Sequence, residues 1–348
     1  MAAPGRPRLA MEHRRPQSLQ ADGQARQSRR GIAARPLAPR RQGPTTPVMT
    51  VFQEHEILVL GDLHGQYDEV DARFIEKRSP LLTVFVGDLG DEDPEIASKV
   101  CELRTPQVVI LGNHDAWRSF REKKPTKELH ETLARVGNKH LAYRRHELPE
   151  IGMTMVGARP FSWGGLSLRS PELYKELFGI ENHEESAERI VEVAEEADTK
   201  RIILVAHNGP MGLGDRSGDI VGKDFGKPGG DWGDLDLQLA LRQLEDLGFE
   251  VPIVIFGHMH HRLLFPRGST RERCVVRGNT VFFNSARVPR IWQPRDADTG
   301  PIRHFATLTF RDKQLFRVRD LLASPKGLRG RTFYERGTLQ PQVRDTNG

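Results

Sequence analysis

The sequence predicts an α/β fold in which short buried strands alternate with helices. Five apolar runs rich in β-branched residues are each bounded by glycine or polar residues, which is the pattern of a buried strand. Stretches with the helical period of apolar residues separate these runs, which is typical of strands joined by helical crossovers. We therefore expect a sheet with helices packed outside it.

Each of the five predicted strands ends just before residue types that bind metal ions. The strands cover residues 56–60, 82–86, 108–111, 201–206 and 251–256. The polar residues that follow them are, in chain order, Asp62, His64, Asp88, Asn113, His207, His258 and His260. Because ligands of open α/β sheets bind outside the carboxyl ends of the strands, we expect these side chains to gather at one site.

The remaining elements follow from amphipathic periods and turn residues. Helices are expected over residues 67–77, 95–103, 126–136, 171–178, 184–197 and 235–247, and later strands over 151–158, 280–284, 305–310 and 314–318. Residues from about Leu322 onward are polar and basic, which predicts a frayed tail. The predicted division is therefore a domain over 49–320 and a tail over 321–348.

The glycine-rich stretch 208–233 begins directly after His207 and carries seven charged residues. Loops of this length inside a domain are usually functional or disordered, and we interpret this one as a lid or specificity element. Trp232 near its end either stacks on a ring of the substrate or anchors the loop. The anchor is the favoured interpretation, because large aromatic side chains usually pack.

Composition places the chain among globular proteins of one large or two small domains. It has 348 residues, of which 37% are hydrophobic. No run approaches the roughly 18 apolar residues that a membrane helix needs, so no membrane partner is expected. The two cysteines, Cys101 and Cys274, form no disulfide framework, which favours a reducing compartment and predicts a cytoplasmic protein.

The positive charge of the chain is concentrated in residues 1–48. This arm carries ten arginines and only two acidic residues, whereas the whole chain has a net charge of +5, so the remainder is net negative. The arm has no hydrophobic period and is predicted to be disordered. Three interpretations stay open: a translated upstream region with initiation near Met49, which we favour; a transit peptide, which would place the protein in a plastid; or a basic tail.

The polar residues at the strand ends offer oxygen and imidazole nitrogen but no thiolate. This donor set suits divalent Mn, Fe or Zn. One carboxylate can bridge two metal ions that lie about 3.5–4 Å apart. Asp88 is the candidate for the bridge, because it lies between the other ligand-bearing strand ends and is followed by Gly90, which eases close approach. The sequence therefore predicts a pair of divalent ions.

These blocks resemble the signature of the calcineurin-like metallophosphoesterase superfamily. They stand in the family's order as Asp62-Leu63-His64, Gly87-Asp88, Gly112-Asn113-His114-Asp115, His207 and Gly257-His258-Met259-His260. The resemblance extends from about Glu56 to Phe310. Within the superfamily, the chain is similar to uncharacterised cyanobacterial and plastid members. It implies the family's four-layer α-β-β-α sandwich, in which two mixed sheets pack together with helices outside.

The resemblance also implies a role for each residue of the site. One ion would be held by Asp62, His64, Asp88 and His260, and the other by Asp88, Asn113, His207 and His258. His114 would face the substrate and protonate the leaving oxygen, and Asp91 would orient it. Asp115 is interpreted as a helix N-cap. The implied reaction is hydrolysis of a phosphate ester, in which a hydroxide bridging the two ions attacks phosphorus in line.

The sequence departs from the phosphoprotein phosphatases of this superfamily. Those enzymes continue the second block with Asp-Arg-Gly, where this chain has Asp91-Glu92-Asp93. The phosphate-binding arginine is missing from its usual place, which favours a smaller phosphomonoester or phosphodiester as the substrate. Arg159, Arg216 and Lys223 are the candidates for contacts with the substrate.

Alternative functions stay open from the sequence. A phosphoprotein phosphatase is the first alternative, despite the missing arginine. A non-catalytic metal-binding scaffold is the second, although every ligand position is filled and His114 is present. A nucleic-acid-binding module rests on the arm alone and is not indicated for the core. The sequence does not define the oligomeric state.

Overall fold

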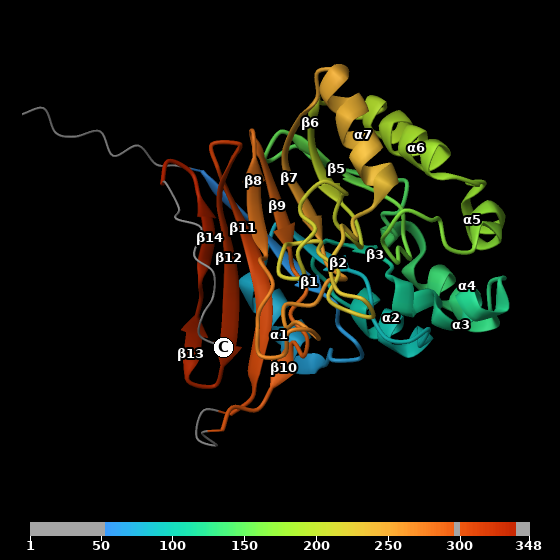
Figure 1. Cartoon of the computed structure of the whole chain (residues 1–348). Helices are drawn as coiled ribbons and strands as arrows, with labels where there is room; N and C mark the ends of the chain where they lie inside the picture. The colour runs from blue at the N-terminus through green and yellow to red at the C-terminus, as the bar shows by residue number, and fades with distance from the viewer. Residues whose placement is uncertain (1–52, 296–299, 339–348) are drawn as a thin grey trace, which may run out of the picture. The chain divides into compact units, whose positions relative to one another are not determined.

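Alternating side chains along the central strands create two buried faces on each sheet. In the strand β1 (Glu54–Gly61), Ile57 and Val59 pack into a core between two sheets, whereas Leu58 and Leu60 pack into a core that includes the helices. The computed structural model describes residues 53–295 and 300–338. Over these residues the predicted four-layer sandwich is confirmed, with two mixed sheets between outer helices (Figure 1).

The first sheet is built on three parallel strands. Its order is β13 (Gly327–Arg329), β12 (Gln314–Ser324), β11 (Ile302–Arg311), β1, β2 (Leu82–Val86) and β3 (Gln107–Ile110), with β10 (Ile291–Trp292) paired to β11 and β14 (Thr332–Glu335) paired to β12. Strands β1, β2 and β3 run parallel, and β11 is antiparallel to β1. Three carboxyl ends therefore lie at one edge of this sheet.

The second sheet is also mainly parallel. Its order is β4 (Arg145–Leu148), β5 (Met153–Gly157), β6 (Arg201–Val205), β7 (Glu250–Phe256), β9 (Thr280–Asn284) and β8 (Cys274–Arg277). Strands β5, β6, β7 and β9 run parallel, while β4 and β8 are antiparallel to their neighbours. The carboxyl ends of β6 and β7 lie next to one another.

Helices cover the outer faces of both sheets. They are α1 (Glu69–Arg78), α2 (Pro94–Cys101), α3 (Trp117–Glu122), α4 (Lys127–Val136), α5 (Pro171–Phe178), α6 (His183–Glu195) and α7 (Leu235–Asp246), with short 3₁₀ turns at Asn113–Ala116 and Gly137–Lys139. Phe74 of α1 stacks on Phe305 of β11, and α6 lies against β5 beside α7 (Figure 1). Among the described residues no helix is long and apolar enough to span a membrane.

The prediction of a frayed tail from Leu322 is wrong as far as Glu335. Strand β12 continues to Ser324, and β13 and β14 pair with it. Phe333 and Tyr334 pack against the core between the sheets, and Arg317 pairs with Glu335 at 3.0 Å. Strands β4 and β8 and helix α3 were also not predicted. The polar residues of the tail therefore cover an apolar face, and the strands extend past the predicted boundary at 320.

The predicted arm over residues 1–48 lies outside the described residues, so its interpretation stays a prediction. Deletion of residues 1–48 is expected to leave folding and hydrolysis intact, because the buried core of the described residues begins at Ile57. The check is the melting temperature and the phosphoesterase rate of a chain that starts at Met49. A large fall in melting temperature would mean that the arm packs on the rest of the protein.

Candidate metal centre

The carboxyl ends of five parallel strands bring seven polar side chains together. Four of the residues concerned have a positive φ, a conformation that L-amino acids other than glycine rarely adopt: Asp62 at 49°, His64 at 43°, Asp88 at 48° and His258 at 65°. Each such residue costs on the order of 1–3 kcal/mol, and residues of this kind collect at functional sites. The side chains of these four strained residues belong to two groups of candidate donors that meet at Asp88.

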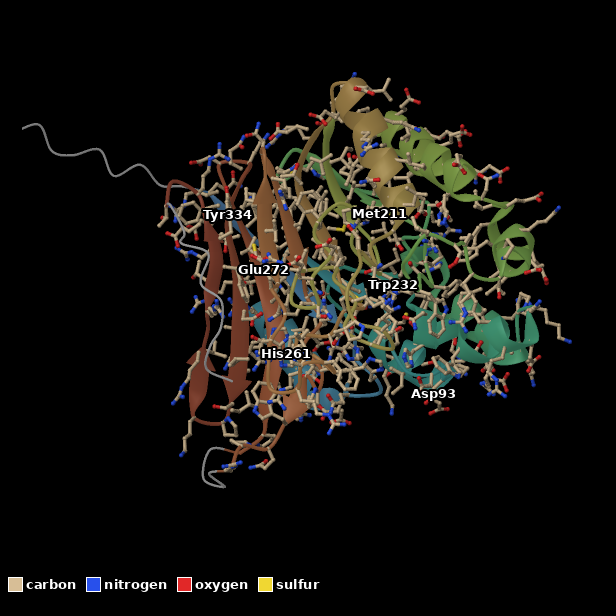
Figure 2. The ribbon with its side chains drawn as sticks, in the orientation of Figure 1. Asp93, Met211, Trp232, His261, Glu272 and Tyr334 are labelled. Carbon is tan, nitrogen blue, oxygen red and sulfur yellow. The ribbon has the colours of Figure 1, made fainter. Side chains whose placement is uncertain are left out.

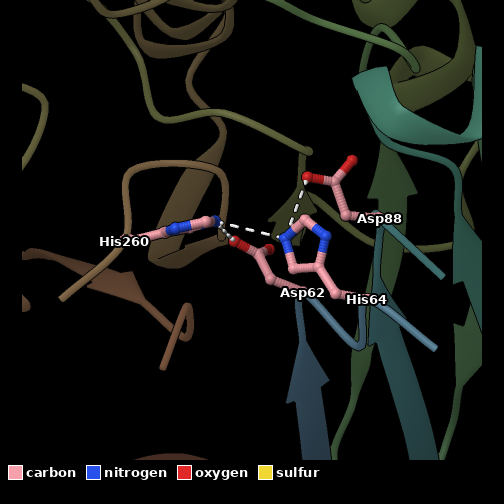
Figure 3. Close-up of side chains that lie close together, drawn as sticks. All are labelled: Asp62, His64, Asp88 and His260. Carbon is pink, nitrogen blue, oxygen red and sulfur yellow. Dashed lines mark hydrogen bonds and ion pairs between the residues drawn. The ribbon is translucent and has the colours of Figure 1, made fainter. Parts of the chain in front are cut away.

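The first group of side chains consists of Asp62, His64, Asp88 and His260 (Figure 3). His64 Nε2 lies 3.7 Å from Asp88 Oδ2, and His260 Nε2 lies 3.6 Å from Asp62 Oδ2. The two imidazole Nε2 atoms lie 3.2 Å apart. Donor atoms that bind one ion at about 2.1 Å are separated by roughly 3–3.5 Å, so this spacing is close to that of a metal site.

The second group consists of Asp88, His207 and His258, with the amide of Asn113 between them. Asn113 Oδ1 lies 2.8 Å from both His207 Nε2 and His258 Nδ1. His207 Nε2 lies 3.4 Å from Asp88 Oδ1. The two oxygens of Asp88 therefore face different groups, Oδ2 toward His64 and Oδ1 toward His207, which is the arrangement of a bridging carboxylate.

Burial sets the electrostatics of these groups. Desolvation raises the pKa of Asp62 and, with help from neighbouring carboxylates, that of Asp88. Desolvation also lowers the pKa of His64 to about 4 and that of His260 to about 3. The histidines are therefore neutral and can act as ligands, and a bound cation would favour the ionised carboxylates.

Asp62 supplies a further test of fit for a metal ion. Its Oδ2 atom is buried and has no hydrogen-bond partner, which is a costly state for a carboxylate oxygen. Two imidazoles and a second carboxylate lie around it, and a divalent cation would satisfy it. The donor set and the unpaired oxygen both fit the divalent ions predicted from the sequence.

Glycines next to the candidate ligands allow the close approach of these side chains. A Cβ atom on Gly112 would overlap the Asp88 carboxylate, and one on Gly257 would overlap that of Asp62. Glycine is therefore required before Asn113 and before His258, because a larger residue would overlap the neighbouring carboxylate. Both glycines are visible in the sequence blocks. Their need is not, because the carboxylates that approach them come from strands far apart in the chain.

His114 lies beside the first group and contacts Asp91 as predicted. Its Nδ1 is 2.6 Å from Asp91 Oδ1, and its backbone N–H donates to Asp88 Oδ1 at 2.9 Å. Its ring stacks on Trp117 with centroids 5.0 Å apart and meets His64 edge-on at 4.8 Å. His64, Asp91 and His114 are also close enough to hold an ion, but the direct contact of Asp91 with Nδ1 fits an orienting carboxylate better.

The interpretation of Asp115 as a simple N-cap is wrong. Its buried carboxylate accepts hydrogen bonds from Gly112 N at 2.8 Å and Gly90 N at 3.1 Å. It therefore ties the loop of Asp88 to that of Asn113. The side chain turns back because both of these amides lie at the strand ends and need an acceptor.

Glu92 is a buried residue that the sequence did not single out. Its carboxylate accepts from the backbone N–H groups of Arg118 at 2.8 Å and Ser119 at 3.1 Å. It also accepts from Thr126 Oγ1 at 3.2 Å. These bonds fix the segment after Asp91 against the start of α3. No local pattern distinguishes Glu92 from its acidic neighbours, since its partners come from more than twenty residues away.

The suggestion that Arg159 contacts the substrate is wrong, because its side chain is 4% exposed. Its guanidinium pairs with Asp236 at 2.8 Å and with Asp234 at 3.1 Å. Arg216 is exposed and pairs with Asp219 at 3.2 Å, and Lys223 lies over the Trp232 ring at 4.7 Å. Arg216 and Lys223 stay predictions.

Arg159→Met is expected to lower the free energy of unfolding by about 3–5 kcal/mol, because two buried carboxylates lose their partner. The metal content of the folded protein should not change. Urea unfolding, with metal analysis at low temperature, provides the check. Unchanged stability combined with a raised KM would instead indicate that Arg159 contacts the substrate.

The loop over residues 208–233 is held in place by its own side chains. Trp232 Nε1 donates to the Trp163 carbonyl at 2.7 Å, which agrees with the predicted anchor. Asp224 is buried and pairs with Arg271 at 2.9 Å. It also accepts from Leu264 N at 2.7 Å, which joins this loop to the segment after His260 (Figure 2 labels Trp232 of the loop and His261 of that segment).

The protein is a two-sheet α/β sandwich with clusters of Asp and His side chains at the ends of its strands. The family model for calcineurin-like phosphoesterases matches residues 55–262. The match covers more than half of the chain, and the protein belongs to this family. It is therefore a metallophosphoesterase, a hydrolase that acts on ester bonds, and its substrate is a phosphoester.

Comparison with solved structures finds similar chains at low sequence identity. The protein TT1561 of Thermus thermophilus is 11% identical, covering 74% of this chain and 98% of its own, with a TM-score of 0.42. A dimetal phosphatase from Danio rerio is 11% identical, covering 80% and 99%, with a TM-score of 0.41. No curated protein is similar enough to match.

Proposed function

We propose that the protein hydrolyses a small phosphomonoester or phosphodiester at a dinuclear metal centre. One ion is held by Asp62, His64, Asp88 and His260, and the other by Asp88, Asn113, His207 and His258. The observation that carries the proposal is the position of Asp88, whose two carboxylate oxygens face different groups of donors. A shared carboxylate brings two ions to the short separation used in phosphoester hydrolysis.

The donor set supports Mn, Fe or Zn as the ions. Oxygen and neutral imidazole without thiolate suit such hard to borderline cations. Bound here, two ions would supply an activated water in line with the leaving group and neutralise charge on the phosphoryl oxygens. The protein contributes the fixed positions of the donors, which the strained turns and the tightly packed glycines maintain.

His114 is proposed as the acid that protonates the leaving oxygen. Asp91 accepts from His114 Nδ1–H, which leaves Nε2 to carry the proton toward the substrate. The stacked Trp117 ring limits rotation of the imidazole. Asp91 acts through His114 and is therefore a positioning residue.

The contacts around Asp91 support a small substrate over a phosphoprotein. Glu92 is buried and bonded to α3, so the position of the arginine in phosphoprotein phosphatases is taken by a residue with a structural role. A phosphoprotein phosphatase and a non-catalytic scaffold stay as alternatives. The free thiols of Cys101 and Cys274 are consistent with our proposal of a cytoplasmic location.

Purified protein is expected to contain two divalent ions per chain and to hydrolyse phosphoesters in a chelator-sensitive manner. The measurements are elemental analysis and rates on a panel of aryl and alkyl monoesters, diesters and phosphopeptides. Activity on phosphopeptides alone would favour the phosphatase alternative. Two bound ions without hydrolysis of any ester would favour the scaffold, and chelator-resistant hydrolysis without metal would contradict the centre.

A further inference from the structure

A cavity of about 420 Å³ lies in the segment that follows the ligand His260. Seven residues line it: Arg262, Leu263, Leu264, Arg267, Gly268, Ser269 and Thr270. Arg262 and Arg267 are exposed, and within residues 53–295 and 300–338 neither of them has an ion-pair partner. Two uncompensated guanidinium groups in one cavity are a typical setting for an anion.

The cavity has a fixed framework. Arg262 pairs with Thr270 across an antiparallel bridge, and Leu263 N donates to the Ser269 carbonyl at 3.0 Å. Leu264 N donates to the buried carboxylate of Asp224 at 2.7 Å. The segment is therefore a closed hairpin tied to the loop after His207.

Arg271 connects this hairpin to the metal centre. Its buried guanidinium donates from Nε to the carbonyl of His260 at 3.0 Å and pairs with Asp224 at 2.9 Å. The charge of Asp224 is thus matched by Arg271, which leaves the charges of Arg262 and Arg267 available. Arg262 follows His260 by two residues, so the two Cα atoms are at most about 7 Å apart.

We propose that this cavity binds a second anionic group of the substrate, at the end remote from the ester that is cleaved. This inference rests on the proposed function and narrows its substrate class. Arg262 and Arg267 recognise a phosphate or carboxylate, and the exposed side chain of Leu264 covers a short apolar link. The substrate is a phosphoester whose scissile group and second anion are separated by a few carbon atoms.

Non-hydrolysable probes test the cavity without turnover. The probes are butylphosphonate, with one anionic group, and two longer ligands, 5-phosphonopentanoate and pentane-1,5-diyl bisphosphonate. Calorimetry on the metal-loaded protein measures the affinity of each. The wild type should bind one or both longer ligands on the order of tenfold or more tightly than butylphosphonate. The longer ligand that binds more tightly identifies the second anion as a carboxylate or a phosphate.

Matched variants assign the preference to the two arginines. The double variant Arg262→Gln, Arg267→Gln should bind the longer ligands no more tightly than butylphosphonate. Its butylphosphonate affinity and metal content should stay unchanged. The double variant Arg262→Lys, Arg267→Gln should recover part of the preference for the longer ligands. The control is Arg329→Gln on the exposed strand β13, which should not change the affinity of any probe. Equal affinity of the wild type for all three probes, or a preference that survives the double variant, would overturn the inference. Failure of the proposed function is seen separately, as absence of metal and of hydrolysis.

Discussion

Asp88→Asn is expected to lose metal from both positions and to reduce turnover more than any other ligand substitution. Its carboxylate is the only donor that the first group (Asp62, His64, Asp88 and His260) shares with the second group (Asp88, His207 and His258) among the described residues. Loss of a residue that merely supports a ligand costs about 10–100-fold in metal affinity or activity, so loss of the shared ligand should cost more than 10²-fold. Elemental analysis and kcat on an aryl phosphate are the measurements.

Single-group ligands provide the comparison for this variant. His260→Asn removes a donor from the first group only and should leave one ion bound. Asparagine at 88 keeps the shape of the side chain and removes a buried charge, so the fold should survive, which circular dichroism can verify. An Asp88→Asn protein that keeps two ions would rule out the bridge.

The grouping of the candidate ligands could be predicted because their signals are local. A β-branched apolar run followed by glycine and a ligand residue describes the end of a parallel strand wherever it occurs. His207 followed the same rule without belonging to a longer motif. Convergence of the strand ends then followed from the geometry of α/β sheets, so seven side chains were placed together without knowledge of the sheet order.

The errors have a common cause in contacts between distant parts of the chain. Arg159 is buried because Asp234 and Asp236 approach it from the start of α7, more than seventy residues later. Asp115 turns back because amides from two different strand ends need an acceptor. The tail forms strands because β12 offers an edge to pair with. None of these partners can be identified from the residues on either side.

His114→Ala is expected to keep both ions and to lose on the order of 10²–10⁴ in turnover, the range for a positioned general acid. The contact of His114 with Asp88 is made by its backbone N–H, which alanine retains, so the ligand geometry should not change. The loss should be larger for alkyl phosphates than for nitrophenyl phosphate, because a good leaving group needs little protonation. Asp91→Asn should follow the same trend with a smaller loss, since it removes only the orienting carboxylate 2.6 Å from Nδ1. A fall in metal content in His114→Ala, or equal losses for both leaving groups, would make His114 a ligand or a packing residue instead of the acid.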